Sequence, residues 1–326
     1  MGSNSLPRAP LHPDTADVQN YMPEGAPLDT EEGLAGLRQI LAFKLEDVLR
    51  GYQDKISHED IDIPGPAGQM RATIFRPKPG FTASSVAETP GIINFHMGGH
   101  VSGNRFMGVK SPLEWVAELG AVCLTAEYRL TPEHPQPAQL DDSYAALKWM
   151  SEHAAELGFN PHKLIVTGGS AGGNLAAGVA LLARDRSGPE ILGQLLIYPW
   201  VDDSNETISI HQFGHVKPWT RDFSVVACNY ALGKNRERAS IYTVPSRAKD
   251  HLNGLPSAFI DVGSADVFRD ESIEYANALM KCGVQTELHV WPGCWHAFDV
   301  FVPDAPIARR AARARLEWFQ DLVSRA

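Results

Sequence analysis

The chain has 326 residues, of which 44% are hydrophobic and 21% are charged. This balance is typical of a folded globular protein and excludes a disordered or collagen-like chain. The 29 basic and 39 acidic residues give a formal net charge of −10, which disfavours nucleic acid and anionic membrane surfaces as partners. A small, weakly charged molecule is therefore the predicted partner.

The cysteines show no CxxC spacing and are too sparse to form a disulfide framework, so Cys123, Cys228, Cys282 and Cys294 are predicted to be free thiols in a reducing compartment. The N-terminus has no apolar signal-peptide core. The longest clean apolar run, residues 175–183, is far shorter than the roughly 18–20 residues that span a bilayer. We predict a cytoplasmic protein with no membrane insertion.

The first predicted element is an amphipathic helix within residues 31–53, where apolar residues recur with helical spacing. They are Leu34, Leu37, Leu41, Leu45 and Val48. Short runs rich in strand-forming residues follow near 58–64, 69–77, 91–95, 121–127, 164–167, 193–198, 257–263 and 286–291. From the third run onward helical patterns alternate with them, including 137–157, 171–185, 271–282 and 306–324. This alternation predicts an α/β fold with a mostly parallel sheet of about eight strands, covered on both faces.

Residues 202–253 interrupt the alternation with about fifty residues between two strands, and they are rich in aromatic side chains. This interval is predicted to be an inserted cap. Ligands are expected at the carboxyl ends of the parallel strands. The arginines of the last helical pattern, Arg309, Arg310, Arg313 and Arg315, are expected on a solvated helix face.

A candidate nucleophile stands between a strand and a helix, in Gly168-Gly169-Ser170-Ala171-Gly172. In the G-x-S-x-G turn the serine adopts a strained conformation, and the flanking glycines avoid clashes with neighbouring elements. The alternative is an ordinary glycine-rich loop in which Ser170 caps the helix. A phosphate-binding loop is set aside because the spacing fits neither glycine-rich motif for nucleotides.

A serine nucleophile needs a base and a carboxylate that orients the base. Asp266 follows the strand near 257–263 and His296 follows the strand near 286–291, so both are expected at the same edge of the sheet as Ser170. Asp261 and His289 lie inside these strands and are expected to be structural. The order serine, aspartate, histidine is that of the α/β-hydrolase triad.

Backbone donors for a substrate oxygen are predicted in the loop His96-Met97-Gly98-Gly99, which follows another strand. Glycines let N–H groups approach a ligand closely, so Gly98, Gly99 and Ala171 are the candidate oxyanion hole. A metal site at this loop is disfavoured because a Gly-Gly pair is a poor helix former and the glutamate of the zinc motif is missing. No metal is predicted.

Together with Ser170, Asp266 and His296, the segments 96–99, 128–135 and 168–173 resemble the hormone-sensitive-lipase-like family of α/β-hydrolases over about residues 70–320. The resemblance implies an eight-stranded core at 54–201 and 254–326, and a cap made of an N-terminal helical segment, 1–53, and the insertion 202–253. It also implies no cofactor, hydrolysis of short- to medium-chain carboxylic esters and a frequent homodimer.

Carried over by position, the resemblance makes Ser170 the nucleophile, completed by Asp266 and His296, and makes His96 a loop-positioning residue. The chain departs from the family in two places. Met97 replaces the first glycine of H-G-G-G, and Gly169 replaces the acidic residue before the serine. These departures bear on specificity and on the pH profile more than on activity.

The predicted function is therefore a serine carboxylesterase acting on short- to medium-chain or aryl esters, with activity falling below about pH 6–7 because the base must be neutral. Met97, Phe213 and Trp219 are predicted to line the substrate pocket. An amidase, a deacetylase or an acyltransferase of a secondary metabolite would use the same machinery. A non-catalytic small-ligand receptor on this fold is disfavoured because His296 is present.

Overall fold

The computed structural model describes residues 6–20, 26–80 and 85–326. Its centre is an eight-stranded sheet in the order β1-β2-β4-β3-β5-β6-β7-β8. β1 is antiparallel to β2 and β2 to β4, and the other neighbours are parallel. The strands are β1 Ile56–Gly65, β2 Gly68–Pro77, β3 Gly91–Phe95, β4 Val122–Ala126, β5 Leu164–Gly169, β6 Gly193–Ile197, β7 Ser257–Gly263 and β8 Thr286–Trp291. The predicted α/β fold with a mostly parallel sheet is confirmed.

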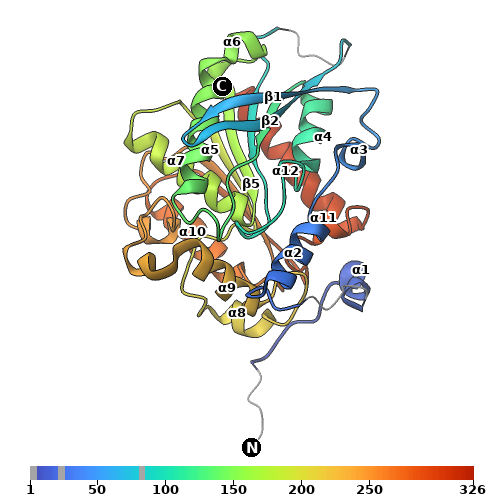
Figure 1. Cartoon of the computed structure of the whole chain (residues 1–326). Helices are drawn as coiled ribbons and strands as arrows, with labels where there is room; N and C mark the ends of the chain where they lie inside the picture. The colour runs from blue at the N-terminus through green and yellow to red at the C-terminus, as the bar shows by residue number, and fades with distance from the viewer. Residues whose placement is uncertain (1–5, 21–25, 81–84) are drawn as a thin grey trace, which may run out of the picture.

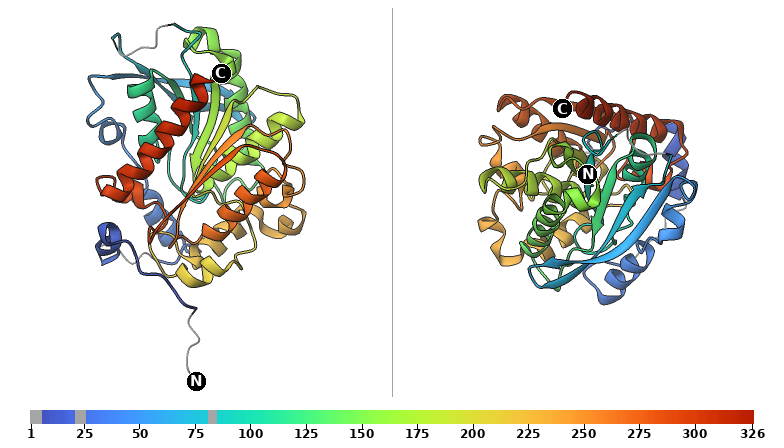
Figure 2. Two further views of the ribbon diagram at one scale, coloured as in Figure 1. Left: turned by 180° about the vertical axis from the view of Figure 1, so that it is seen from behind. Right: turned by 90° about the horizontal axis from the view of Figure 1, so that it is seen from above.

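Helices cover both faces of this sheet (Figures 1 and 2). One face carries α5 (Ala138–Glu152), α7 (Ala171–Asp185) and α10 (Arg269–Lys281), and the other carries α4 (Lys110–Leu119) and α12 (Pro306–Ser324). The strands at the centre are buried over their whole length, as expected for a sheet with two covered faces. Trp115 of α4 packs on Phe319 of α12, with ring centroids 5.3 Å apart.

The N-terminal helix is interrupted where the sequence predicts one element over 31–53. α2 (Glu31–Ile40) ends at the buried Leu41, and a separate short helix, α3 (Leu45–Val48), follows. The side chain of Asn104 donates a hydrogen bond of 2.8 Å to the carbonyl of Phe43 in the gap. A tertiary contact thus overrides a continuous helical pattern. The helix predicted at 137–157 is likewise divided, into α5 and α6 (Ala154–Leu157).

The segment 202–253 contains α8 (Ile208–Phe213), α9 (Arg221–Leu232), η3 (Gly233–Arg238) and η4 (Pro245–Ala248). In Figure 1, α8 and α9 lie beyond one end of the sheet, near α2. No helix in the described ranges is long and apolar enough to cross a membrane.

The stretch 6–20, which includes α1 (Pro13–Ala16) and η1 (Asp17–Asn20), lies against the loop after β8. The N–H of His12 donates to the carbonyl of Gly293 over 2.8 Å, and the indole N–H of Trp295 donates to the carbonyl of Thr15 over 3.1 Å. Gln19 pairs with the backbone of Lys217 through both its amide nitrogen and its amide oxygen. The first described residues therefore contact both the loop that carries His296 and the segment after α8.

Candidate active site

Ser170 stands at the turn from β5 to α7 in a strained backbone conformation, with φ 55° and ψ −120°. Its N–H donates to the carbonyl of Ile197 over 2.9 Å. The turn is so tight that a Cβ at Gly168 would lie 2.4 Å from the backbone of Gly172, and a Cβ at Gly172 would lie 2.0 Å from the carbonyl oxygen of Phe95. Glycine is therefore required on both sides of the serine.

The three residues predicted as a triad meet at the carboxyl edge of the sheet. His296 Nε2 lies 3.0 Å from Ser170 Oγ, and its Nδ1 lies 2.9 and 3.1 Å from the two carboxylate oxygens of Asp266. A carboxylate only accepts, so Nδ1–H donates to Asp266 and Nε2 accepts from the serine hydroxyl. Asp266 is fully buried and also accepts the N–H of Phe268 over 2.9 Å. This arrangement can remove the hydroxyl proton of Ser170.

Three aromatic rings surround the imidazole of His296. Tyr198 and Phe268 lie edge-on at centroid distances of 4.9 and 5.0 Å, and Trp219 lies 6.5 Å away. The hydroxyl of Tyr198 donates to Asp299 over 2.9 Å. Sequence reasoning did not single out Tyr198, although its place directly after β6 puts it at the carboxyl edge, where site residues gather.

Arg315 is not on a solvated face, contrary to the prediction for the last helix. It is 1% exposed and forms ion pairs with Asp261 of β7, at 2.8 Å, and with Asp299. Arg315 is buried because residues four positions apart lie on the same face of a helix. It stands four residues after Ala311 and four before Phe319, which are both fully buried. Arg315, Asp299 and Tyr198 thus form a polar connection from α12 to the ring packed against His296.

The glycine loop after β3 has the backbone geometry that only glycine adopts readily. Gly98 and Gly99 have φ values of 120° and 64°. A Cβ at Gly98 would lie 2.2 Å from the carbonyl oxygen of Ser102, and one at Gly99 would lie 2.1 Å from the indole of Trp219. As the first residue of α7, Ala171 has an N–H without an intrahelical acceptor.

His96 is fully buried beneath this loop and stacks on Tyr128 at 3.9 Å. Its Nδ1 donates to the carbonyl of Met97 over 2.9 Å, and the hydroxyl of Tyr128 donates to the carbonyl of His96 over 2.8 Å. Burial lowers the pKa of His96, although Glu127 nearby acts in the opposite direction. A neutral His96 therefore ties the loop to the core.

A cavity of about 480 Å³ opens at Ser170 and His296. Its apolar wall combines the glycine loop, α2 and the segment 217–223, and its larger side chains are Leu37, Met97, Met107, Trp219, Phe223 and Phe301. Of the predicted pocket residues, Met97 and Trp219 line this cavity, whereas Phe213 does not. Phe213 lies at the end of α8 and packs in a buried cluster with Trp291, Trp295 and Phe298, because this side of α8 faces the loop after β8.

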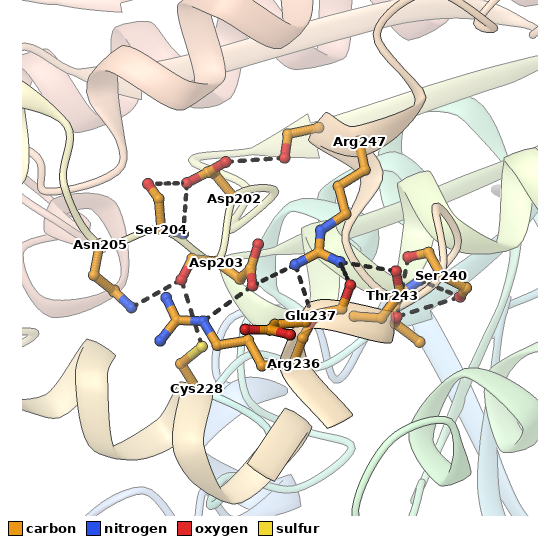
Figure 3. A network of polar contacts seen from close by, with 12 residues as sticks. Asp202, Asp203, Ser204, Asn205, Cys228, Arg236, Glu237, Ser240, Thr243 and Arg247 are labelled. Carbon is orange, nitrogen blue, oxygen red and sulfur yellow. Dashed lines mark hydrogen bonds and ion pairs between the residues drawn. The ribbon is translucent and has the colours of Figure 1, made fainter. Parts of the chain in front are cut away.

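A polar network holds together the segment that follows β6 (Figure 3). Asp203 accepts from Arg236 over 3.1 Å and from Arg247 over 2.8 Å. Asp202 accepts from the hydroxyl of Ser246 over 3.0 Å. These contacts fasten η3 and η4 to the residues directly after the sheet.

Glu271 in the first turn of α10 is a buried carboxyl behind the candidate triad. Its Oε1 accepts the N–H groups of Val201 and Asp202, over 2.7 and 3.1 Å. Burial raises the pKa of Glu271 well above its usual value, Asp202 and Asp266 raise it further, and the backbone hydrogen bonds oppose them. The folded protein therefore favours the protonated form of this carboxyl.

Replacing Glu271 with glutamine is expected to change how stability depends on pH. Between the unfolded pKa of about 4.3 and the raised folded pKa of Glu271, the wild-type free energy of unfolding loses about 1.4 kcal/mol per pH unit from this group, because the unfolded chain releases its proton first. The variant has no such loss, so its stability relative to wild type grows with pH. Urea unfolding of both proteins at pH 5 and pH 8 measures this, and parallel pH profiles would contradict it.

The remaining metal-ligating and nucleophilic side chains form no second site among the described residues. Among the described residues, no three histidine, cysteine, aspartate or glutamate side chains gather as metal ligands do. The four cysteines are free. Cys294 lies two residues before His296, but burial raises its pKa to about 12, so the unreactive thiol form prevails.

This fold, with a serine, histidine and aspartate at the ends of β5, β8 and β7, defines an α/β hydrolase. A family model for the alpha/beta hydrolase fold matches residues 92–300. Esterase LipI of Mycobacterium tuberculosis (strain ATCC 25618 / H37Rv) is 31% identical over 293 residues, covering 89% of this chain and 88% of that protein. Carboxylesterase NlhH of the same strain is 35% identical over 226 residues, covering 68% of this chain and 70% of that protein.

Solved structures agree with these relatives. A bacterial heroin esterase is 32% identical with a TM-score of 0.85, covering 96% of this chain and 98% of that chain. A hyperthermophilic esterase from Pyrobaculum calidifontis is 29% identical with a TM-score of 0.85, covering 96% and 99%. The chain belongs to the hormone-sensitive-lipase-like carboxylesterase family of α/β hydrolases, as the sequence motifs predict.

Proposed function

We propose that the protein is a serine carboxylesterase that hydrolyses short- to medium-chain or aryl carboxylic esters through an acyl-enzyme on Ser170. The observation that carries this proposal is the hydrogen-bonded line from Asp266 through His296 to Ser170, which ends in the apolar cavity. The relatives named as esterases support it.

In the proposed reaction His296 takes the proton of Ser170 while the serine oxygen attacks the ester carbonyl. The N–H groups of Gly98, Gly99 and Ala171 hold the oxyanion of the tetrahedral intermediate. His296 then gives the proton to the leaving alcohol, and a water molecule, activated by the same imidazole, hydrolyses the acyl-enzyme. Asp266 keeps the imidazole in the required tautomer, and His96 holds the loop that carries the oxyanion donors.

Replacing Gly99 with alanine is expected to lower kcat by about 10²–10³-fold, the cost of losing one oxyanion donor. The methyl group would meet the indole of Trp219 at 2.1 Å, and the φ of 64° is unfavourable for alanine, so the loop must move. Steady-state hydrolysis of p-nitrophenyl acetate measures the loss. Gly158→Ala is the matched control, since Gly158 also has a positive φ of 84°, does not line this cavity, and a Cβ there meets nothing within 4 Å. An equal loss in both variants would contradict the assignment.

We propose further that residues 1–53 and 202–253 form a cap over an α/β-hydrolase core at 54–201 and 254–326. Residues 1–5 and 21–25 lie outside the described part of the chain. The described part supports a cap because α2 and the segment 217–223 both line the cavity, while Ser170 and His296 come from the sheet. Substrate choice would then depend on the cap and catalysis on the core.

The test of the proposed function is hydrolysis of p-nitrophenyl esters from acetate to palmitate at neutral pH without added metal. We expect the highest kcat/KM with short to medium acyl chains, because the apolar cavity at Ser170 has a limited volume of about 480 Å³. No hydrolysis of any ester by the folded protein would reject the proposal. The site does not support the alternative function of a non-catalytic receptor, because ligand binding alone does not need His296 Nε2 within 3.0 Å of the hydroxyl of Ser170.

Two further proposals concern the cellular location and the oligomeric state of the enzyme. A cytoplasmic location is supported by the four free thiols, and cell fractionation tests it. A homodimer is supported by β8, which pairs with β7 alone among the described strands and exposes Val290. Sedimentation velocity measures the mass in solution.

A further inference from the structure

The two positions at which the chain departs from the family pattern, Met97 and Gly169, are neighbours beside Ser170. Met97 is 2% exposed and lines the cavity. A Cβ at Gly169 would lie 2.9 Å from the terminal methyl carbon of Met97 and 3.2 Å from the ring of Tyr198. The methyl group of Met97 therefore occupies the space that a side chain at position 169 would need.

Met97 is also held on its other sides. Its side chain belongs to a buried apolar cluster that also contains Phe106, Met107 and Tyr198. Its carbonyl oxygen lies so close to Gly103 that a Cβ there would stand 2.3 Å away. That same carbonyl accepts the hydrogen bond from His96. The thioether therefore has little freedom to move away from Gly169, because protein interiors are packed at nearly crystalline density.

We propose that Met97 and Gly169 form one specificity-determining unit. The thioether reaches from the glycine loop across position 169, and in doing so it limits the depth of the cavity beside Ser170 and keeps this wall uncharged. Such a wall fits an uncharged acyl or aryl group of limited size. The inference rests on the proposed ester hydrolysis for its effect on substrates, but the contact itself does not.

Thermal unfolding of a double-mutant cycle tests the contact without any substrate. Gly169→Val alone is expected to lower Tm by roughly 3–10 °C, because it overpacks the space beside Met97. In a Met97→Ala background the same valine is expected to raise Tm, because it fills the cavity that the truncation leaves. Equal effects of the valine in both backgrounds would overturn the inference. If Gly169→Val does not fold, Gly169→Ala serves the same comparison.

Met107→Ala provides the matched control. Met107 is also a buried methionine that lines the cavity, but the three atoms nearest to a Cβ at position 169 belong to Met97 and Tyr198. In this background Gly169→Val is expected to lower Tm as it does in the wild type. A valine that raises Tm here too would show a general loosening of the cavity and would overturn the pairing.

The substrate effect is measured as the ratio of kcat/KM for p-nitrophenyl octanoate to that for acetate. Met97→Ala is expected to raise this ratio by about 10-fold or more, the discrimination typical of a few methylene groups in an apolar pocket, and Gly169→Val in that background is expected to lower it again. An unchanged ratio would overturn the specificity role. If the wild type hydrolyses no ester, the proposed function fails, and the unfolding cycle still decides whether the two residues are coupled.

Discussion

Replacing Ser170 with alanine is expected to lower kcat for p-nitrophenyl ester hydrolysis by about 10⁴–10⁶-fold. The variant lacks the oxygen that attacks the carbonyl, while the N–H groups of the glycine loop remain. Alanine meets the strained backbone of this turn no worse than serine does, and the hydrogen bond from the N–H of residue 170 to Ile197 is kept. The loss should therefore appear in kcat with an unchanged circular dichroism spectrum and Tm.

Ser143 supplies the control for this result. It is 2% exposed on α5 and belongs neither to the cavity lining nor to the candidate triad. Ser143→Ala is expected to keep kcat/KM near that of wild type. Residual activity of Ser170→Ala above about one hundredth of wild type would reject the acyl-enzyme on Ser170 and would require another nucleophile.

Replacing Arg315 with methionine is expected to lower the free energy of unfolding by about 3–5 kcal/mol. Methionine has a similar length, so the main loss is electrostatic. Asp261 is fully buried and would lose its cationic partner. Asp299, which pairs with the same guanidinium, would also lose its partner. Urea unfolding monitored by tryptophan fluorescence measures the change.

Arg313 on the same helix is the matched control, because its side chain is 63% exposed and pairs with Glu317 one turn further along. Exposed pairs of this kind contribute little, so Arg313→Met is expected to leave the midpoint of unfolding within experimental error. A similar fall in the free energy of unfolding in both variants would mean that the buried ion pair stabilises the fold no more than the exposed one does. A fall in kcat of Arg315→Met at temperatures where it is folded would show that the connection through Asp299 and Tyr198 also positions His296.

The sequence predicts those site residues whose positions follow from the ends of the strands. Ser170, Asp266 and His296 each stand within five residues of the end of a strand, and parallel strands bring such positions to one edge. Their distances fit the predicted arrangement, and their catalytic roles stay predictions until the variants are measured. The strand and helix pattern is also well predicted, since α7 and α12 have the expected bounds.

The remaining features depend on tertiary contacts that no local pattern contains. The gap after Ile40 contains Phe43, whose carbonyl accepts a hydrogen bond from Asn104, some sixty residues away. Phe213 and Trp219 are both aromatic residues of one insertion, but Phe213 at the end of α8 packs in a buried cluster, whereas Trp219, between α8 and α9, lines the cavity. The contact between Met97 and Gly169 joins the loop after β3 to the last residue of β5. It depends on the spacing of these strands, which the sequence does not specify to within an ångström.

The contact between Thr15 and Trp295 joins residues that are 280 positions apart in the chain. During synthesis on the ribosome, the N-terminal stretch emerges long before the loop that it finally covers, and protein synthesis adds only about 5–20 residues each second. The N-terminal stretch therefore cannot reach its packing partner until the loop with His296 has been synthesised. A nascent chain can form β1 to β6 while it still lacks Asp266 and His296, so the site cannot be assembled before residue 296 has been synthesised.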